Sequence, residues 1–145
     1  MSRPQPTRRL IEPHALAYDG FRWHARAFDR ETGEFRDFVL GRISRPKIGA
    51  PAQSKPHDDR DWFEIVALKI APHPRLTPAQ AKAIALDYGI GKASATIRVR
   101  RALMFYALRR LGLDLPPDTR PPQEQHIVLI NRAEIGSLGA RAIFT

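Results

Sequence analysis

The chain has 145 residues, a formal net charge of +9 at pH 7 and no cysteine. This length suits one domain of ordinary size or two small ones, and a hydrophobic fraction of 43% is enough for a buried core. The lack of cysteine excludes a disulfide framework, a thiolate nucleophile and a Cys-based zinc site. A basic surface favours a polyanionic partner, and nucleic acid is the leading candidate.

The apolar runs of the sequence are far too short to span a bilayer, and the N-terminus MSRPQPTRR lacks the apolar core of a signal peptide. We therefore expect a cytoplasmic protein that does not bind membranes.

The first part of the chain has the pattern of antiparallel β structure. Residues 8–28 give two strand-like runs around Asp19 and Gly20, a pair that readily takes positive φ in a tight hairpin. Another turn, with Gly33 as its pivot, leads to a third strand over residues 35–43.

The middle of the chain reads as a linker. The stretch RPKIGAPAQSKPHDDRD, residues 45–61, replaces any apolar period with Pro, Gly, Ser and charged residues. Its His-Asp-Asp run at residues 57–59 has metal-capable side chains but no second cluster to complete a coordination shell, so we interpret it as a solvated charge run. We predict a first domain over 1–47, a linker over 48–61 and a second domain over 62–145.

The second domain alternates strands and helices. The predicted order is strand, helix, strand, helix and strand, over residues 62–70, 76–88, 95–100, 101–111 and 126–131. Thr77 is the expected N-cap of the first helix, with Pro78 at its first position, and Gly112 ends the second helix. This order predicts a small α+β sandwich.

An unusual alternation of charge occupies residues 22–27. Because residues two apart on a strand share a face, Trp23 and the two alanines are expected to enter a core, while Arg22, His24 and Arg26 face outward. Guanidinium groups and planar side chains on one surface suit the phosphates and bases of single-stranded nucleic acid or a nucleotide. The alternative is a solvated sheet face, on which such side chains protect an edge strand.

The stretch IEPHALAYDGFRWHARAFDRETGEFRDFVLGRI resembles the WYL domain, a small Sm-like β-barrel of bacterial transcriptional regulators. The matching segments are residues 13–16, Gly20 with Arg22 and Trp23, residues 36–38 and residues 40–43. Several spaced matches make the resemblance specific. Residues 62–135 resemble the C-terminal extension of these regulators, called WCX, which in the family mediates dimerisation.

The resemblance implies a ligand site of basic residues. Matching positions are His14, His24, Arg26, Arg36 and Arg42, and the strand face adds Arg22. Several arginines on one concavity repel one another unless an anion is bound. The family's Trp-Tyr-Leu is Trp-His-Ala at residues 23–25 here, which leaves the ligand open. The resemblance also implies that the family's first barrel strand and winged helix-turn-helix are absent from this sequence.

The sequence therefore predicts a non-enzymatic module of a WYL-type transcriptional regulator, without cofactor or metal, that senses single-stranded nucleic acid or a nucleotide-like anion. Two alternatives stay open. Residues 76–112, a helix, a Gly-containing turn and a basic helix, also look like a helix-turn-helix DNA reader. The other alternative is a structural interaction module with a solvated basic face. We expect a homodimer formed through residues 62–145, with strand exchange in the first unit as a second route, because an unpaired sheet edge and an apolar helix favour self-association.

Overall fold

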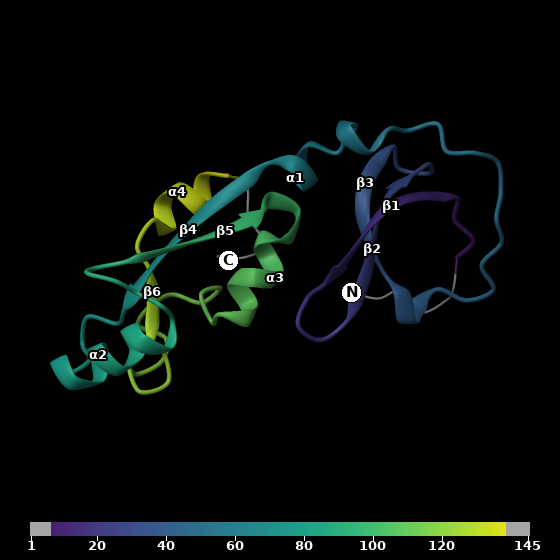
Figure 1. The fold of residues 1–145 in the computed structure, drawn as a ribbon. Coiled ribbons are helices and arrows are strands. Elements are labelled where there is room, and N and C mark those ends of the chain that lie inside the picture. The colour runs from purple at the N-terminus through teal and green to yellow at the C-terminus, as the bar shows by residue number, and fades with distance from the viewer. Residues whose placement is uncertain (1–6, 139–145) are drawn as a thin grey trace. The chain divides into compact units, whose positions relative to one another are not determined.

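The computed structural model describes residues 7–138 and divides the chain into two compact units between Arg60 and Asp61 (Figure 1). Each unit holds a three-stranded antiparallel sheet, so the predicted α+β class is confirmed. Two segments lie outside the described residues. They are residues 1–6, from the N-terminus that was predicted to lack a signal peptide, and residues 139–145, from the second predicted domain. Among those described, no helix has the length and apolar character needed to cross a membrane.

The first unit is an open sheet of three strands in the order β1-β2-β3, without barrel closure in its described part. The strands span β1 (Ile11–Tyr18), β2 (Trp23–Asp29) and β3 (Glu34–Val39). The two predicted turns are confirmed: Gly20 has φ of 97° and Gly33 has φ of 73°, a backbone region that favours glycine. The third strand is shorter than expected, because the chain turns into the 3-10 helix η1 (Leu40–Arg42).

Residues 43–59, here called the connecting segment, fall within the first compact unit, Met1–Arg60. Glu12 on β1 holds this segment, since its Oε1 accepts the backbone N–H groups of Gln53 (2.6 Å) and Ser54 (2.7 Å). These bonds lower the pKa of Glu12, Ser54 having the largest effect. The segment ends in the 3-10 helix η2 (Pro56–Asp58).

The second unit follows the predicted alternation of strands and helices. Its elements are α1 (Arg60–Phe63), which begins at the unit boundary, β4 (Ile65–Pro72), α2 (Pro78–Asp87), β5 (Ala95–Arg100), η3 (Arg101–Leu103), α3 (Met104–Arg110), β6 (Ile127–Leu129) and α4 (Arg132–Ser137). The first strand starts later than predicted because a short helix takes up residues 60–63, and α4 is an additional helix that was not predicted. β4 lies in the middle of the sheet, antiparallel to both neighbours.

The start of α2 shows why the sequence begins a helix there. Thr77 Oγ1 accepts the backbone N–H of Gln80 at 3.2 Å, and Gln80 Oε1 accepts the N–H of Thr77 at 3.0 Å. This reciprocal capping box, with Pro78 at the first helical position, satisfies donors that a helix N-terminus leaves open.

The helix-turn-helix alternative for residues 76–112 is wrong. Strand β5 separates α2 from α3 and pairs with β4 along its full length, from Ile65 opposite Arg100 to Ile70 opposite Ala95. A helix-turn-helix needs two helices joined by a short turn.

The hydrophobic core lies in the second unit. It combines side chains from the sheet, from the three longer helices and from the loops that follow α2 and α3, namely Val66, Leu68, Ile70, Ile84, Ile90, Met104, Leu108, Leu113, Ile127, Leu129 and Ile135. Among the described residues of the first unit, by contrast, the buried hydrophobic side chains are Ala17, Ala25 and Ala27, and the other buried residues are polar or charged. The two units are therefore stabilised in different ways.

The second core gives a direct stability test. Replacing Leu108, which is 0% exposed, by alanine should lower the free energy of unfolding by about 2–5 kcal/mol, because a cavity remains in a packed core. The matched change Leu86→Ala on α2 removes the same atoms from a side chain that is 77% exposed, and should cost no more than about 0.5 kcal/mol. Urea denaturation followed by circular dichroism measures both, and equal losses would contradict this core.

Candidate ligand site

Strand β2 places the candidate residues by simple alternation. The pairing register sets Arg26 opposite Ala15 of β1 and Asp37 of β3, while Ala25 lies opposite Leu16 and Phe38. Because direct partners share a face of a sheet, the charged and the small apolar side chains of β2 lie on opposite faces, as the sequence predicted.

Arg26 is the centre of the charged face. Its Nε donates to Asp59 Oδ2 at 2.7 Å and its Nη2 to Asp59 Oδ1 at 2.9 Å, a bidentate pair between β2 and the connecting segment. Its Nη1 donates to Asp37 Oδ1 at 3.3 Å. Burial of the guanidinium opposes its ionisation, but these two carboxylates hold the pKa of Arg26 above its ordinary value. Arg26 is therefore a buried, permanently charged group.

His14 reaches the same carboxylate from β1. Its Nε2 lies 2.9 Å from Asp59 Oδ2, and its ring meets Phe35 edge to face, with 5.6 Å between centroids. The register of β1 against β2 shifts between Pro13 and Ala15, so His14 sits in a β-bulge. Bulges re-aim side chains, and here the bulge accompanies the turn of the imidazole toward Asp59.

His24 contacts the turn between β1 and β2. Its Nε2 lies 2.7 Å from Asp19 Oδ2, while Asp19 Oδ1 accepts the backbone N–H groups of Phe21 (2.7 Å) and Arg22 (2.6 Å). The hydrogen bond with His24, followed by these backbone bonds, lowers the pKa of Asp19 to about 2. The Nε atom of Arg22 lies 3.8 Å from Asp19 Oδ2, and the Arg22 side chain is partly exposed.

Arg36 and Arg42 are the outlying members of the predicted site. Arg36 on β3 is half-exposed, with Nη1 3.6 Å from Asp29 Oδ2, an oxygen that also accepts from Arg9 Nη1 at 2.7 Å. Burial alone would raise the pKa of Asp29, but the backbone N–H of Glu31 and the Arg9 guanidinium lower it. Arg42 is exposed on η1.

The six predicted residues thus fall into separate groups along the sheet. His14 and Arg26 meet on Asp59, His24 and Arg22 meet on Asp19, and Arg36 and Arg42 lie apart. The expectation that Arg22, His24 and Arg26 all face outward is wrong for His24 and Arg26. Both are buried against carboxylates because the turn and the connecting segment supply acids to that face.

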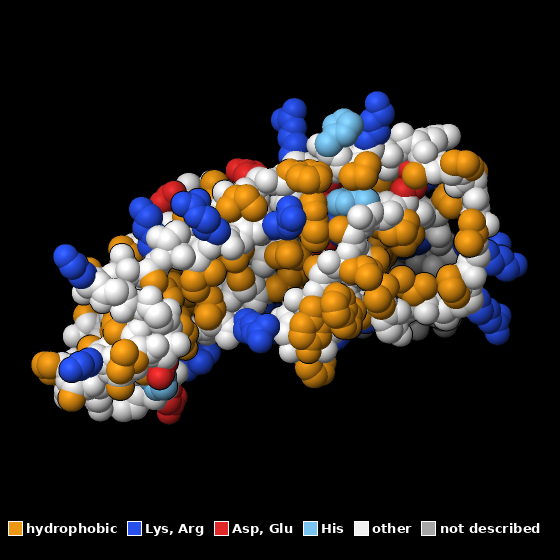
Figure 2. Space-filling model, viewed as in Figure 1, with side chains coloured by type: hydrophobic (Ala, Val, Ile, Leu, Met, Phe, Trp, Pro, Cys, Tyr) orange, Lys and Arg blue, Asp and Glu red, His pale blue; other side chains and the backbone are white. Residues whose placement is uncertain are grey.

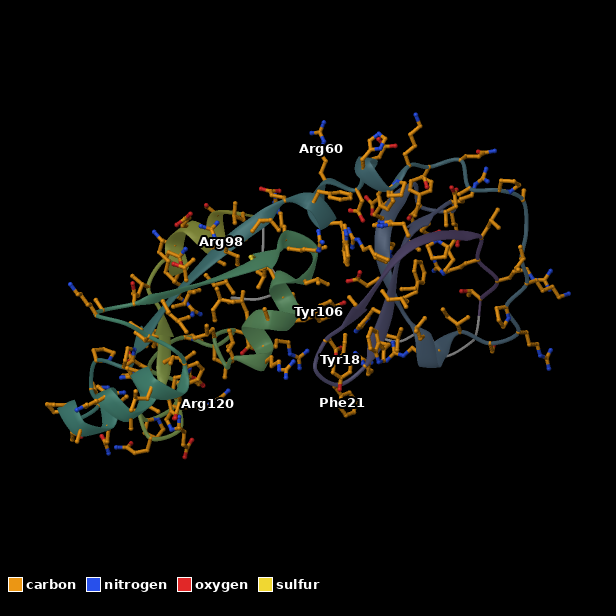
Figure 3. The ribbon with its side chains drawn as sticks, viewed as in Figure 1. Tyr18, Phe21, Arg60, Arg98, Tyr106 and Arg120 are labelled. Carbon is orange, nitrogen blue, oxygen red and sulfur yellow. The ribbon has the colours of Figure 1, made fainter. Side chains whose placement is uncertain are left out.

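The placement of Trp23 in a core is also wrong, because Trp23 is 52% exposed. Trp23 pairs with Tyr18 in the last register position before the turn, and their ring centroids are 5.3 Å apart. Tyr18 and Phe21 lie at the same turn end of the β1–β2 hairpin (Figure 3), and both are exposed. Ala25 and Ala27, farther along β2, are buried as predicted.

Sequence reasoning missed the acidic partners. Asp59 was assigned to a solvated charge run, yet its side chain is 2% exposed. Arginine and histidine side chains that become buried need carboxylate partners, but the sequence does not show which of the distant acidic residues supplies them. Among the described residues, no group of His, Cys, Asp and Glu has an arrangement that could hold a metal ion.

Comparison with known proteins agrees with this architecture. Residues 1–48 match the model of the WYL domain, and residues 65–135 match that of the BrxR transcriptional regulator C-terminal dimerization domain. The chain therefore carries a WYL domain followed by a C-terminal dimerization domain of regulator type, which confirms the resemblance found in the sequence.

Among curated proteins, the chain is similar to DNA-binding transcriptional repressors named CapW. It is 38% identical over 138 residues to CapW of Stenotrophomonas maltophilia, an alignment that covers 93% of this chain and 46% of that protein. It is 36% identical to CapW of Pseudomonas aeruginosa and 34% identical to CapW of Escherichia coli, each time over 95% of this chain and 46% of the relative. The chain thus spans about half the length of these relatives.

Because the ion pair between Arg26 and Asp59 is buried, its loss should cost much more stability than the loss of an exposed ion pair. Arg26→Ala should lower the free energy of unfolding by about 3–5 kcal/mol, because it leaves Asp59 buried without its main cation. Arg36→Ala, which removes the same side chain from a half-exposed position on β3, should cost no more than about 1 kcal/mol. Thermal and urea melts compare the two variants, and similar losses would show that the Arg26 pair does not stabilise the first unit.

Proposed function

We propose that this chain is the ligand-sensing and dimerising part of a transcriptional repressor, and that its ligand is single-stranded nucleic acid or a nucleotide-like anion. The family matches of the two units and the repressors to which the chain is similar support this role. The role requires binding and assembly and no catalytic step.

One observation carries the ligand proposal. At the turn end of the β1–β2 hairpin, the rings of Tyr18, Phe21 and Trp23 are exposed, and the side chain of Arg22 in the same turn is partly exposed. Figure 2 shows hydrophobic side chains gathered toward this end of the first unit. Bases stack on exposed rings and phosphates pair with guanidinium groups, so this aromatic tip suits an unpaired strand or a nucleotide.

The other exposed arginines of the predicted set lie elsewhere in the first unit. Arg42 extends from η1, which contacts β2, and Arg36 lies exposed on β3 opposite Ala27, so both are accessible to phosphates of a ligand that runs along the sheet. The buried residues His14, His24 and Arg26 lie on the charged face of the same sheet. In this proposal the accessible arginines make the first contacts with the ligand.

The second unit joins two copies of the chain in our proposal. Its match to a dimerization domain supports this role, and β5 and β6 are the outer strands of its described sheet. Apolar side chains such as Phe63, Ile65 and Ile130 are exposed on this unit. Ligand binding in the first unit would then alter the geometry of a dimer, and through it the DNA binding of the complete regulator.

A single-stranded oligonucleotide tests the ligand proposal. Binding of a fluorescein-labelled 10-mer, about the length of one binding site, should weaken steeply with salt, since each neutralised phosphate releases about 0.7 counterion. Trp23→Ala should weaken binding by about 1–3 kcal/mol through lost stacking. The control Tyr88→Ala removes an exposed ring at the C-terminal end of α2 in the second unit and should leave affinity unchanged. Absence of binding at low salt would favour the purely structural alternative.

The assembly proposal has its own measurement. Size exclusion with light scattering should give a mass of about 33 kDa at micromolar concentration, twice the 16.4 kDa of one chain. A mass of one chain at every accessible concentration would contradict the dimer and the proposed route from ligand to DNA.

A further inference from the structure

The cationic side chains on the charged face of β2 are paired with carboxylates of the chain itself. His24 pairs with Asp19 of the adjoining turn, and Arg26 pairs with Asp37 of the neighbouring strand, so both of these acids belong to the sheet and its hairpins. Asp59 differs from them, because it comes from the connecting segment, 33 residues beyond Arg26. It is also the neighbour of Arg60, the last residue of the first unit.

The groups that surround Asp59 form a receptor for an oxyanion. Two N–H groups of one guanidinium and one imidazole nitrogen converge on its two oxygens within 2.7–2.9 Å. The fork of an arginine fits the oxygens of a phosphate in the same way as those of a carboxylate. The site therefore does not distinguish Asp59 from a phosphate by its hydrogen-bonding pattern.

The receptor is positioned independently of Asp59. His14 lies on β1 and packs on Phe35, and Arg26 lies on the central strand with a second contact to Asp37. The connecting segment has a separate anchor at Glu12, through Gln53 and Ser54. Release of Asp59 can thus free the end of the segment while the sheet and the Glu12 anchor stay in place.

We propose that His14 and Arg26 form an anion-binding site that Asp59 occupies in this structure, and that a phosphate group of the ligand takes the place of Asp59. The identity of that ligand rests on the proposed function above. Exchange of the two anions releases residues 55–60, which lead directly into the second unit. Asp59 therefore acts as an internal competitor, and its displacement reports ligand binding at the junction of the two units.

The first test compares two neighbouring acids. Asp59→Asn and Asp58→Asn each remove one negative charge, but Asp58 is exposed and its carboxylate lies only near His57, at 3.6 Å. With inorganic tripolyphosphate as the probe, Asp59→Asn should bind about tenfold more tightly than Asp58→Asn, because a competing group is gone. Equal affinities of the two variants would overturn the proposal, since both carry the same net charge.

The second test needs no variant and decides the matter if Asp59→Asn fails to fold. In the wild-type chain, tripolyphosphate should speed hydrogen exchange at Asp58 and Asp59, whose N–H groups bond to Lys55 and Pro56 carbonyls in η2. The amides of Gln53 and Ser54, held by Glu12, serve as the internal control and should not change. Saturation of the chain without faster exchange at residues 58 and 59 would overturn the proposal.

The labelled oligonucleotide separates this inference from the proposed function. If Asp59→Asn gains affinity for tripolyphosphate while no protein binds the oligonucleotide, the anion site stands and the nucleic acid ligand is wrong. If the wild type binds the oligonucleotide but the two variants bind tripolyphosphate equally, the aromatic tip stands and the displacement of Asp59 is wrong.

Discussion

The first unit depends on the bidentate bond between Arg26 and Asp59. In the part that the structure describes, its buried hydrophobic side chains are three alanines, which supply little apolar area, and the remaining buried groups include Glu12, His24, Arg26, Asp29 and Asp59. Removal of such charges from water is costly unless each one is paired and hydrogen-bonded. The fork of Arg26 meets this requirement by joining the central strand to the connecting segment. The segment therefore completes the unit.

The second unit follows the commoner rule in which apolar burial drives folding. Its central strand β4 contributes Val66, Leu68 and Ile70 to a cluster that helices close over. A cation is also present at its beginning, where the guanidinium of Arg100 lies 4.5 Å from the ring centre of Trp62 and donates to the Trp62 carbonyl. This contact adds to a core that is already apolar, whereas in the first unit the ion pairs take the place of such a core.

Local patterns predicted most of the fold, because turns, caps and alternation act over a few residues. The Gly20 and Gly33 turns, the Thr77 cap and strand β5 follow from such signals. The acidic partners of the site could not be predicted, because Asp59 meets Arg26 through tertiary packing and a Pro-rich segment gives no period from which to infer a face. Trp23 was misplaced for a related reason, since alternation assigns a face but does not tell where along the strand that face is covered.

The pairing of residues 26 and 59 also constrains how this sequence can diverge. A chain that loses the arginine retains a buried carboxylate with its main counterion removed, and a chain that loses the aspartate retains a buried guanidinium. Either intermediate is disfavoured, so the two positions should be inherited together or replaced together across lineages. Such covariation would join two parts of the sequence that share no secondary structure. It would therefore identify the connecting segment as part of the domain in homologues known only from their sequences.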